Sequence, residues 1–203
     1  KIHWNAESKG AVGRLSTEGL PAVFEVFSQD LGQGKNADVI RKLFQSAYLK
    51  HENLAQATRF LANELFGAKG LVILDGDDVL LKNQFTPYVQ EELQNQTAFT
   101  TVTETIQQLK GYHAQVNPRE INLFYLEDNL RERIIYTDGK YQVNNTSLVF
   151  SEVEMLELLE KYPEKFSPNV IMRPLYQEVI LPNLAYIGGG GELAYWLELK
   201  SNF

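Results

Sequence analysis

Apolar residues recur every three to four positions along several stretches of the chain, which predicts helices with one buried face. Residues Val39–Tyr48 follow this period, and Asn36 stands where a helix N-cap is expected. A second helix is predicted from Asn53, because Gln56 follows three residues later as in a capping box. Further helices are expected around residues 87–93, over 97–109 and over 151–162.

Two apolar runs have the composition of strands that are buried on both faces. Leu71–Leu74 lies between Gly70 and Asp75, and Leu184–Ile187 precedes a run of glycines. Helical patterns beside them indicate an α/β fold, so we expect these two strands to lie parallel in one sheet. The glycine-rich residues 1–34 are expected to form loops around one short apolar stretch, residues 22–27.

Residues 114–149 have a different pattern, with short apolar runs separated by polar turns. The step Asp138-Gly139 is a strong signal for a β-hairpin. We therefore expect a small antiparallel segment inserted into the α/β frame. The predicted division is a first core part at 1–110, a β-rich insertion at 111–150 and a return to the core at 151–203.

Composition narrows the classes of function. The 203 residues are 44% hydrophobic, which suits a packed core, and carry a net charge of −7. A nucleic-acid partner is not expected, since phosphate binding needs a cationic face. No apolar run approaches the roughly 20 residues of a membrane span, so no membrane partner is expected. The absence of cysteine excludes disulfides and thiolate metal sites and fits a cytoplasmic location.

A group of acids follows the first predicted strand. Asp75-Gly-Asp77-Asp78-Val79 resembles the first motif of haloacid-dehalogenase-type phosphatases, in which two carboxylates hold Mg²⁺ and act on phosphorus. The later paired acids that such enzymes need are missing. The alternative, which we favour, is that these acids form the turn and cap the next helix. His3, His51 and His113 are scattered, without zinc-ligand spacing, so no metal site is predicted.

Four glycines, Gly188–Gly191, follow the second predicted strand and precede a helix pattern that begins at Glu192. Glycines at a strand-to-helix turn let a ligand approach the backbone, and a helix start offers N–H groups to an anion. The alternative is a tight turn that needs positive φ angles. The spacing matches neither a dinucleotide fingerprint nor a P-loop.

Polar residues before the glycines add a possible anion clamp. Arg173 precedes a proline and is therefore expected in an extended conformation. Its guanidinium suits a two-point contact with a carboxylate, or an internal salt bridge with Glu178. Both interpretations stay open from the sequence.

The C-terminal stretch Phe166–Lys200 resembles the family of bacillithiol biosynthesis cysteine-adding enzymes. The phrases LFGAKGLVILDGDD and NPREINLFYL resemble the same family, in the same order. In that family the turn usually has a proline among the glycines, and Gly190 takes its place here, which makes the loop looser.

The resemblance implies a ligase that forms an amide between cysteine and glucosaminyl-malate, completing the thiol bacillithiol. It implies a partial Rossmann-like parallel sheet with helices and an inserted β segment, and a coiled coil elsewhere in the full-length protein that makes a homodimer. The family's first two core strands, with their Gly-rich and His-rich turns, have no counterpart here. We therefore expect an internal piece of the enzyme that is inactive by itself.

The resemblance also implies a substrate pocket, without giving any residue a catalytic role. Its expected lining is Arg173, Gln177, Glu178, Gly188, Gly189, Gly190, Gly191, Glu192, Tyr195 and Trp196. Cysteine and glucosaminyl-malate are the expected small-molecule partners. The cofactor is unknown: the resemblance allows ATP, but no nucleotide motif indicates it. A ligand-binding fragment without catalysis, and the phosphatase, are the alternatives.

Overall fold

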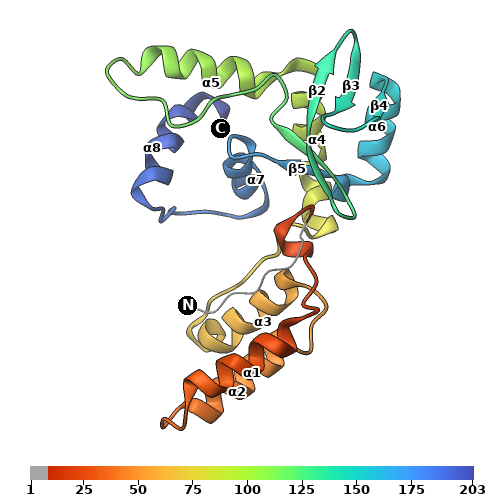
Figure 1. Ribbon diagram of the computed structural model, residues 1–203. Coiled ribbons are helices and arrows are strands. Elements are labelled where there is room, and N and C mark those ends of the chain that lie inside the picture. Colours follow the sequence, from red (N-terminus) through yellow and green to blue (C-terminus); the bar gives the residue numbers. More distant parts are fainter. Residues whose placement is uncertain (1–8) are drawn as a thin grey trace. The chain divides into compact units, whose positions relative to one another are not determined.

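The computed structural model describes residues 9–203, which form two compact units (Figure 1). The first contains the residues up to Asp75 together with Asp128–Leu130, and the second contains Gly76–Glu127 and Arg131–Phe203. His3 lies outside the described residues. No helix among residues 9–203 is both long enough and apolar enough to cross a membrane.

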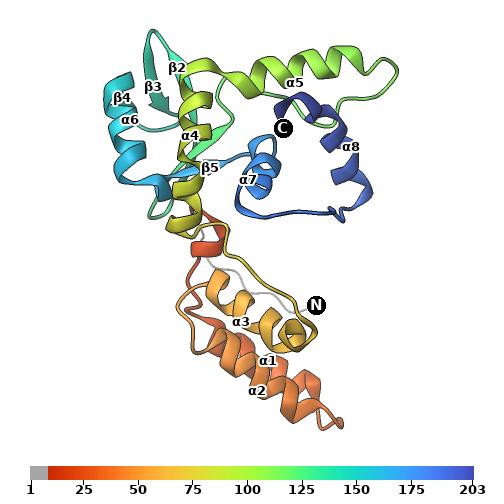
Figure 2. The same cartoon turned by 180° about the vertical axis from the view of Figure 1, so that it is seen from behind.

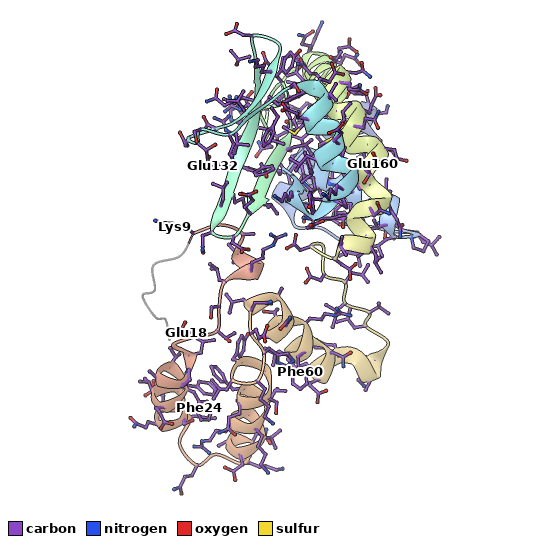
Figure 3. All side chains as sticks on the ribbon, turned by 90° about the vertical axis from the view of Figure 1, so that its right-hand side faces the viewer. Lys9, Glu18, Phe24, Phe60, Glu132 and Glu160 are labelled. Carbon is purple, nitrogen blue, oxygen red and sulfur yellow. The ribbon has the colours of Figure 1, made fainter. Side chains whose placement is uncertain are left out.

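The first unit is built from three α-helices. They are α1 (Leu20–Leu31), α2 (Ala37–Tyr48) and α3 (Leu54–Phe66), with short 3-10 turns η1 (Val12–Arg14) and η2 (Gly67–Lys69). Aromatic rings join α1 to α2: the ring centroid of Phe44 lies 5.5 Å from that of Phe24 and 4.9 Å from that of Phe27. Figure 3 labels Phe24 in this unit. Fully buried Ala47 and Ala57 let α2 and α3 pack closely.

The second unit combines helices with one sheet (Figures 1 and 2). Its helices are α4 (Val79–Asn95), α5 (Thr97–Gln108), α6 (Glu152–Lys161), α7 (Met172–Ile180) and α8 (Gly190–Glu198), with 3-10 turns η3 (Pro163–Lys165) and η4 (Lys200–Asn202). Its strands are β1 (Leu123–Glu127), β2 (Leu130–Thr137), β3 (Lys140–Val143), β4 (Val149–Phe150) and β5 (Phe166–Pro168). They are ordered β4-β3-β2-β1-β5.

The strand pairs of this sheet are antiparallel, as predicted for residues 114–149. The predicted hairpin is confirmed: Asp138 and Gly139 connect β2 to β3, and both have positive φ angles, 53° and 74°. Such angles suit a two-residue turn whose twist matches the strands. Helix α6 packs on β3 and β4 and against α4, which buries Tyr141, Met155 and Phe85. The predicted three-part division of the chain stays a prediction.

A buried carboxylate ties α4 to the start of the sheet. Glu92, 1% exposed, accepts hydrogen bonds from the backbone N–H of Ala98 and from both the backbone and side-chain nitrogens of Asn122, each at 2.9 Å. Asn122 in turn accepts from the side chain of Asn169 at 3.0 Å. Burial raises the pKa of Glu92, and these hydrogen bonds oppose the rise only in part.

The predicted parallel sheet is wrong for the described residues. Leu71–Leu74 and Leu184–Ile187 are extended but belong to no strand, and they lie in different units. None of these side chains is buried: Val72 is 79% exposed and Ile187 is 96% exposed. An apolar run shows that a segment favours burial, but a strand also requires neighbours to pair with, and residues 9–203 supply none here.

Several helix predictions are confirmed, with differences at the ends. Ser151 and Glu154 form the expected capping box at the start of α6. Asn53 accepts from the backbone N–H of Gln56, whereas the Asn36 side chain caps nothing. Residues 20–31 form α1 instead of a loop, because Pro21 lies in the first turn of that helix, where no N–H partner is needed.

Candidate functional site

The residues expected to line a pocket lie on α7, on α8 and on the link between them. Helix α7 carries Arg173, Gln177 and Glu178, while α8 carries Glu192 and Tyr195. The link, residues 181–189, has no regular secondary structure and leads into α8, which begins at Gly190 (Figures 1 and 2).

Four of these side chains form one hydrogen-bonded cluster around a guanidinium. Arg173 donates to the Glu192 carboxylate, to the Tyr195 hydroxyl at 2.8 Å and to the Gln177 side-chain oxygen at 3.2 Å. Tyr195 donates to Glu192 at 3.0 Å. Residues three or four apart on one helix face the same side, which brings Glu192 and Tyr195 to Arg173 together. We call these four residues the Arg173 cluster.

Hydrogen bonds and charges around the Arg173 cluster favour the charged forms of Arg173 and Glu192. A hydrogen bond from Tyr186 lowers the pKa of Glu192 most, with Tyr195 and the charge of Arg173 acting in the same direction. Burial opposes the charge of Arg173, yet hydrogen bonds with Tyr195 and Tyr186 raise its pKa. Burial and Glu192 raise the pKa of Tyr186. The carboxylate is therefore held ionised beside a fixed cation.

The structure corrects the expected conformation of Arg173 and decides against one of the two open interpretations of its side chain. Arg173 lies in the first turn of α7 rather than in an extended segment, because Pro174 occupies an early helical position where no N–H partner is required. It does not pair with Glu178, whose carboxylate accepts from the side chain of Asn183 at 2.7 Å. The ion pair is with Glu192, whose position depends on the path of the link.

The glycines do not form the tight turn that was the alternative. None of Gly188–Gly191 is among the glycines with a positive φ angle. A Cβ added to Gly189, Gly190 or Gly191 would meet nothing within 4 Å, so packing within the chain does not require glycine there. At Gly188 an added Cβ would lie 2.7 Å from the ring of Tyr186. Three glycines thus leave an open backbone at the start of α8.

A cavity of about 520 Å³ lies beside the cluster in the second unit. Its lining is Leu175, Glu178, Asn183, Leu184, Ala185, Tyr186, Trp196 and Phe203. The indole nitrogen of Trp196 is buried and has no hydrogen-bond partner among residues 9–203. Glu178 and Trp196 were expected in a pocket. Tyr186 and Asn183 were missed, because their roles depend on how the link folds back onto α8.

Two of the acids after Leu74, Asp77 and Asp78, have structural roles in the second unit. Asp78 caps α4 by accepting from the backbone N–H groups of Leu80 and Leu81, as the favoured alternative predicted. Asp77 pairs at 2.5 Å with the buried ammonium of Lys82, which also donates to the carbonyl of Glu164. No group of three or more potential metal ligands of the His, Cys, Asp and Glu types occurs among residues 9–203.

Comparison with known proteins adds the family. Residues 1–203 match the family described as "Bacillithiol biosynthesis BshC, N-terminal Rossmann-like domain". The chain is 65% identical to "Putative cysteine ligase BshC" of Flavobacterium johnsoniae, and 42% identical to the protein of that name in Cytophaga hutchinsonii. Each alignment covers the whole chain but only 38% and 37% of the relative's length. The chain belongs to the BshC family of bacillithiol biosynthesis proteins and matches its N-terminal Rossmann-like domain.

Proposed function

We propose that the full-length protein is a ligase that joins cysteine to glucosaminyl-malate through an amide bond and so completes bacillithiol. The relatives' name, cysteine ligase, and the family description, bacillithiol biosynthesis, support this assignment. Because the chain spans less than two fifths of those relatives, the activity is proposed for the whole protein. The chain by itself is expected to bind ligand without catalysis.

The assignment of the site depends on the backbone of Gly189–Gly191, which has open space around it. Glycine is helix-destabilising, and neither φ angles nor packing require it at 189–191. Close approach of a substrate gives a physical reason for its presence. The first N–H groups of α8 have no partner within the helix, so they can bind a carboxylate such as that of malate.

The Arg173 cluster supplies charge next to this backbone. Glu192 is the third residue of α8, and its lowered pKa keeps it ionised, which suits an ammonium group of cysteine or glucosamine. Arg173 holds Glu192 in place through a charged hydrogen bond. Trp196 and Glu178, which line the adjoining cavity, extend the proposed site.

Amide formation joins the amine nitrogen to a carboxyl carbon and removes the elements of water, so the carboxyl group needs activation. The proposed contribution of these residues is to orient amine and carboxylate against each other. ATP would supply activation when bound, but no described residue is assigned to it. The cytoplasmic location and the coiled-coil homodimer stay predictions, and the phosphatase is not favoured because Asp77 is held by Lys82.

The test uses the full-length protein with cysteine and glucosaminyl-malate. Gly189→Val should still fold, because a Cβ there meets nothing within 4 Å, and should lose most of its kcat/KM; its melting temperature separates this loss from unfolding. Val23→Ala, on α1 in the first unit, is the control and should keep full activity. Wild-type kcat/KM in both Gly189→Val and Glu192→Gln would exclude this site. If the wild-type protein forms no amide between cysteine and glucosaminyl-malate with ATP present, the proposed function itself is excluded.

A further inference from the structure

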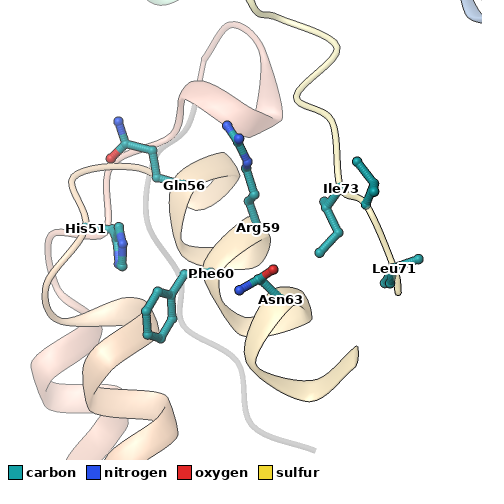
Figure 4. A pocket seen from close by; sticks show the side chains of 8 residues that line it. His51, Gln56, Arg59, Phe60, Asn63, Leu71 and Ile73 are labelled. Carbon is teal, nitrogen blue, oxygen red and sulfur yellow. The ribbon is translucent and has the colours of Figure 1, made fainter. Parts of the chain in front are cut away.

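A groove in the first unit contains none of the residues assigned to the proposed ligase site. It runs between α3 and the extended residues 71–73 and has a volume of about 590 Å³ (Figure 4). Its lining is His51, Gln56, Arg59, Phe60, Asn63, Leu71, Val72 and Ile73. All eight belong to one unit. A volume of this size is in the range of small-molecule sites, roughly 300–1,000 Å³.

Arg59 gives the groove a positive charge that nothing nearby neutralises. It makes no hydrogen bond or ion pair with any residue in 9–203, and no acid lines the groove. Two other arginines are engaged: Arg41 binds Asp38 and two carbonyls, and Arg173 holds its own cluster. A guanidinium that has free donors suits a carboxylate or phosphate.

Two rings form an aromatic surface in the groove. The centroids of Phe60 and His51 lie 5.0 Å apart, with 43° between the ring planes. His51 is fixed at two points: its Nδ1 donates to the Ala47 carbonyl at 2.8 Å, and its own carbonyl accepts from Thr17 at 2.5 Å. The ring is therefore held in place, with Nε2 left for a ligand. Such surfaces bind flat rings by stacking.

Amide groups and an apolar wall complete the lining. The Gln56 side-chain oxygen accepts from the backbone N–H of Glu52 at 3.3 Å, so Gln56 offers its amide N–H groups, whereas Asn63 offers a donor and an acceptor; together they can recognise the polar edge of a heterocycle. Opposite them, Leu71 and Ile73 present apolar side chains (Figure 4).

We propose that this groove binds a small organic anion that carries a flat ring. The ring lies against Phe60 and His51, the anionic group binds Arg59, and the amides of Gln56 and Asn63 contact the ring's polar edge. A nucleoside monophosphate and an aromatic carboxylate share this chemistry. The proposal is independent of the proposed ligase site, which lies in the other unit.

Isothermal titration calorimetry of the full-length protein tests the groove with AMP and with benzoate. Adenosine and inorganic phosphate, which each carry only one part of AMP, are measured for comparison. We expect at least one of the two ring-bearing anions to bind, and adenosine or inorganic phosphate alone to bind more weakly. Arg59→Gln and Phe60→Leu should each raise the Kd of that anion at least about tenfold. Arg133→Gln makes the same charge change on an exposed residue of β2 and should leave the Kd unchanged.

Three results would overturn the proposal. The first is that neither AMP nor benzoate binds at millimolar concentration. The second is that phosphate alone binds as tightly as AMP, which would mean a non-specific anion contact. The third is binding by residues 1–203 that disappears in the full-length protein, which would show that another segment of the polypeptide fills the groove.

Discussion

The rings of Tyr186 and Trp196 stack with their centroids 3.9 Å apart and their planes only 9° from parallel. One residue precedes the glycines and the other lies on α8, so the stack fixes the glycine backbone against its own helix. It also holds the Tyr186 hydroxyl near Glu192, whose pKa that hydroxyl lowers more than any other group does.

Tyr186→Phe should keep the stack and remove this hydroxyl. We expect the pKa of Glu192 to rise towards the ordinary value of 4.5, because its largest stabilising hydrogen bond is lost. Tyr195→Phe is the matched variant and should give a smaller rise. NMR titration of the Glu192 side chain measures both values. A larger rise in Tyr195→Phe would contradict this ranking.

Gly191→Ala should make the protein more stable and less active. The glycine lies in α8, has no positive φ angle and has open space around it, so alanine gains roughly 0.4–1 kcal/mol through lower unfolded-state entropy. The methyl group would stand where we propose that substrate approaches. Chemical denaturation and kcat/KM of the full-length protein test the two effects. Unchanged kcat/KM would mean that substrate does not reach Gly191.

Glu92 should make the protein less stable as the pH rises above about 4.5, the ordinary pKa of the group. Its pKa is raised by burial, so the folded state binds its proton more tightly than the unfolded state does, and stability falls until the folded-state pKa is passed. Denaturation of wild type and Glu92→Gln across this range measures the effect. The stability of wild type relative to the variant should decrease as the pH rises. A difference that stays constant with pH would contradict it.

Tyr141 should resist ionisation until high pH. Burial raises its pKa to about 12, and its hydroxyl donates to the Leu93 carbonyl at 2.8 Å. Tyr141→Phe should cost about 1 kcal/mol of unfolding free energy, since one internal hydrogen bond is lost. It should also remove one late-titrating group from the ultraviolet titration of the tyrosines. Tyr112→Phe, an exposed position, is the control for both measurements.

The parts of the fold that depend on local signals could be predicted from the sequence. The capping box of Ser151 and the hairpin at Asp138-Gly139 act within a few residues, and both are present. The apolar run Leu71–Leu74 has no such local determinant, because pairing depends on distant strands. Pro21 and Pro174 suggested loops or extended chain but occupy first turns, where proline is tolerated.

The candidate site was predicted in outline only. The glycine run and the polar residues around it indicated where Arg173, Glu192 and Tyr195 would gather, because helical spacing places the last two on one face. From the sequence, Glu178 was the only internal partner considered for Arg173, because the pairing with Glu192 depends on the path of residues 181–189. The stacking of Tyr186 depends on the same path. The groove around Arg59 gave no sequence signal beyond an unremarkable polar helix face.

The two ends of the sheet have a consequence for self-association. Its edge strands are β4, with two residues, and β5, with three, and β5 ends in Pro168, which has no N–H to donate. Neighbouring copies therefore find almost no free ladder to extend, which is a common protection against edge-to-edge aggregation. Lengthening β4 by removing its flanking turn residues would give neighbouring copies a longer edge strand with which to pair.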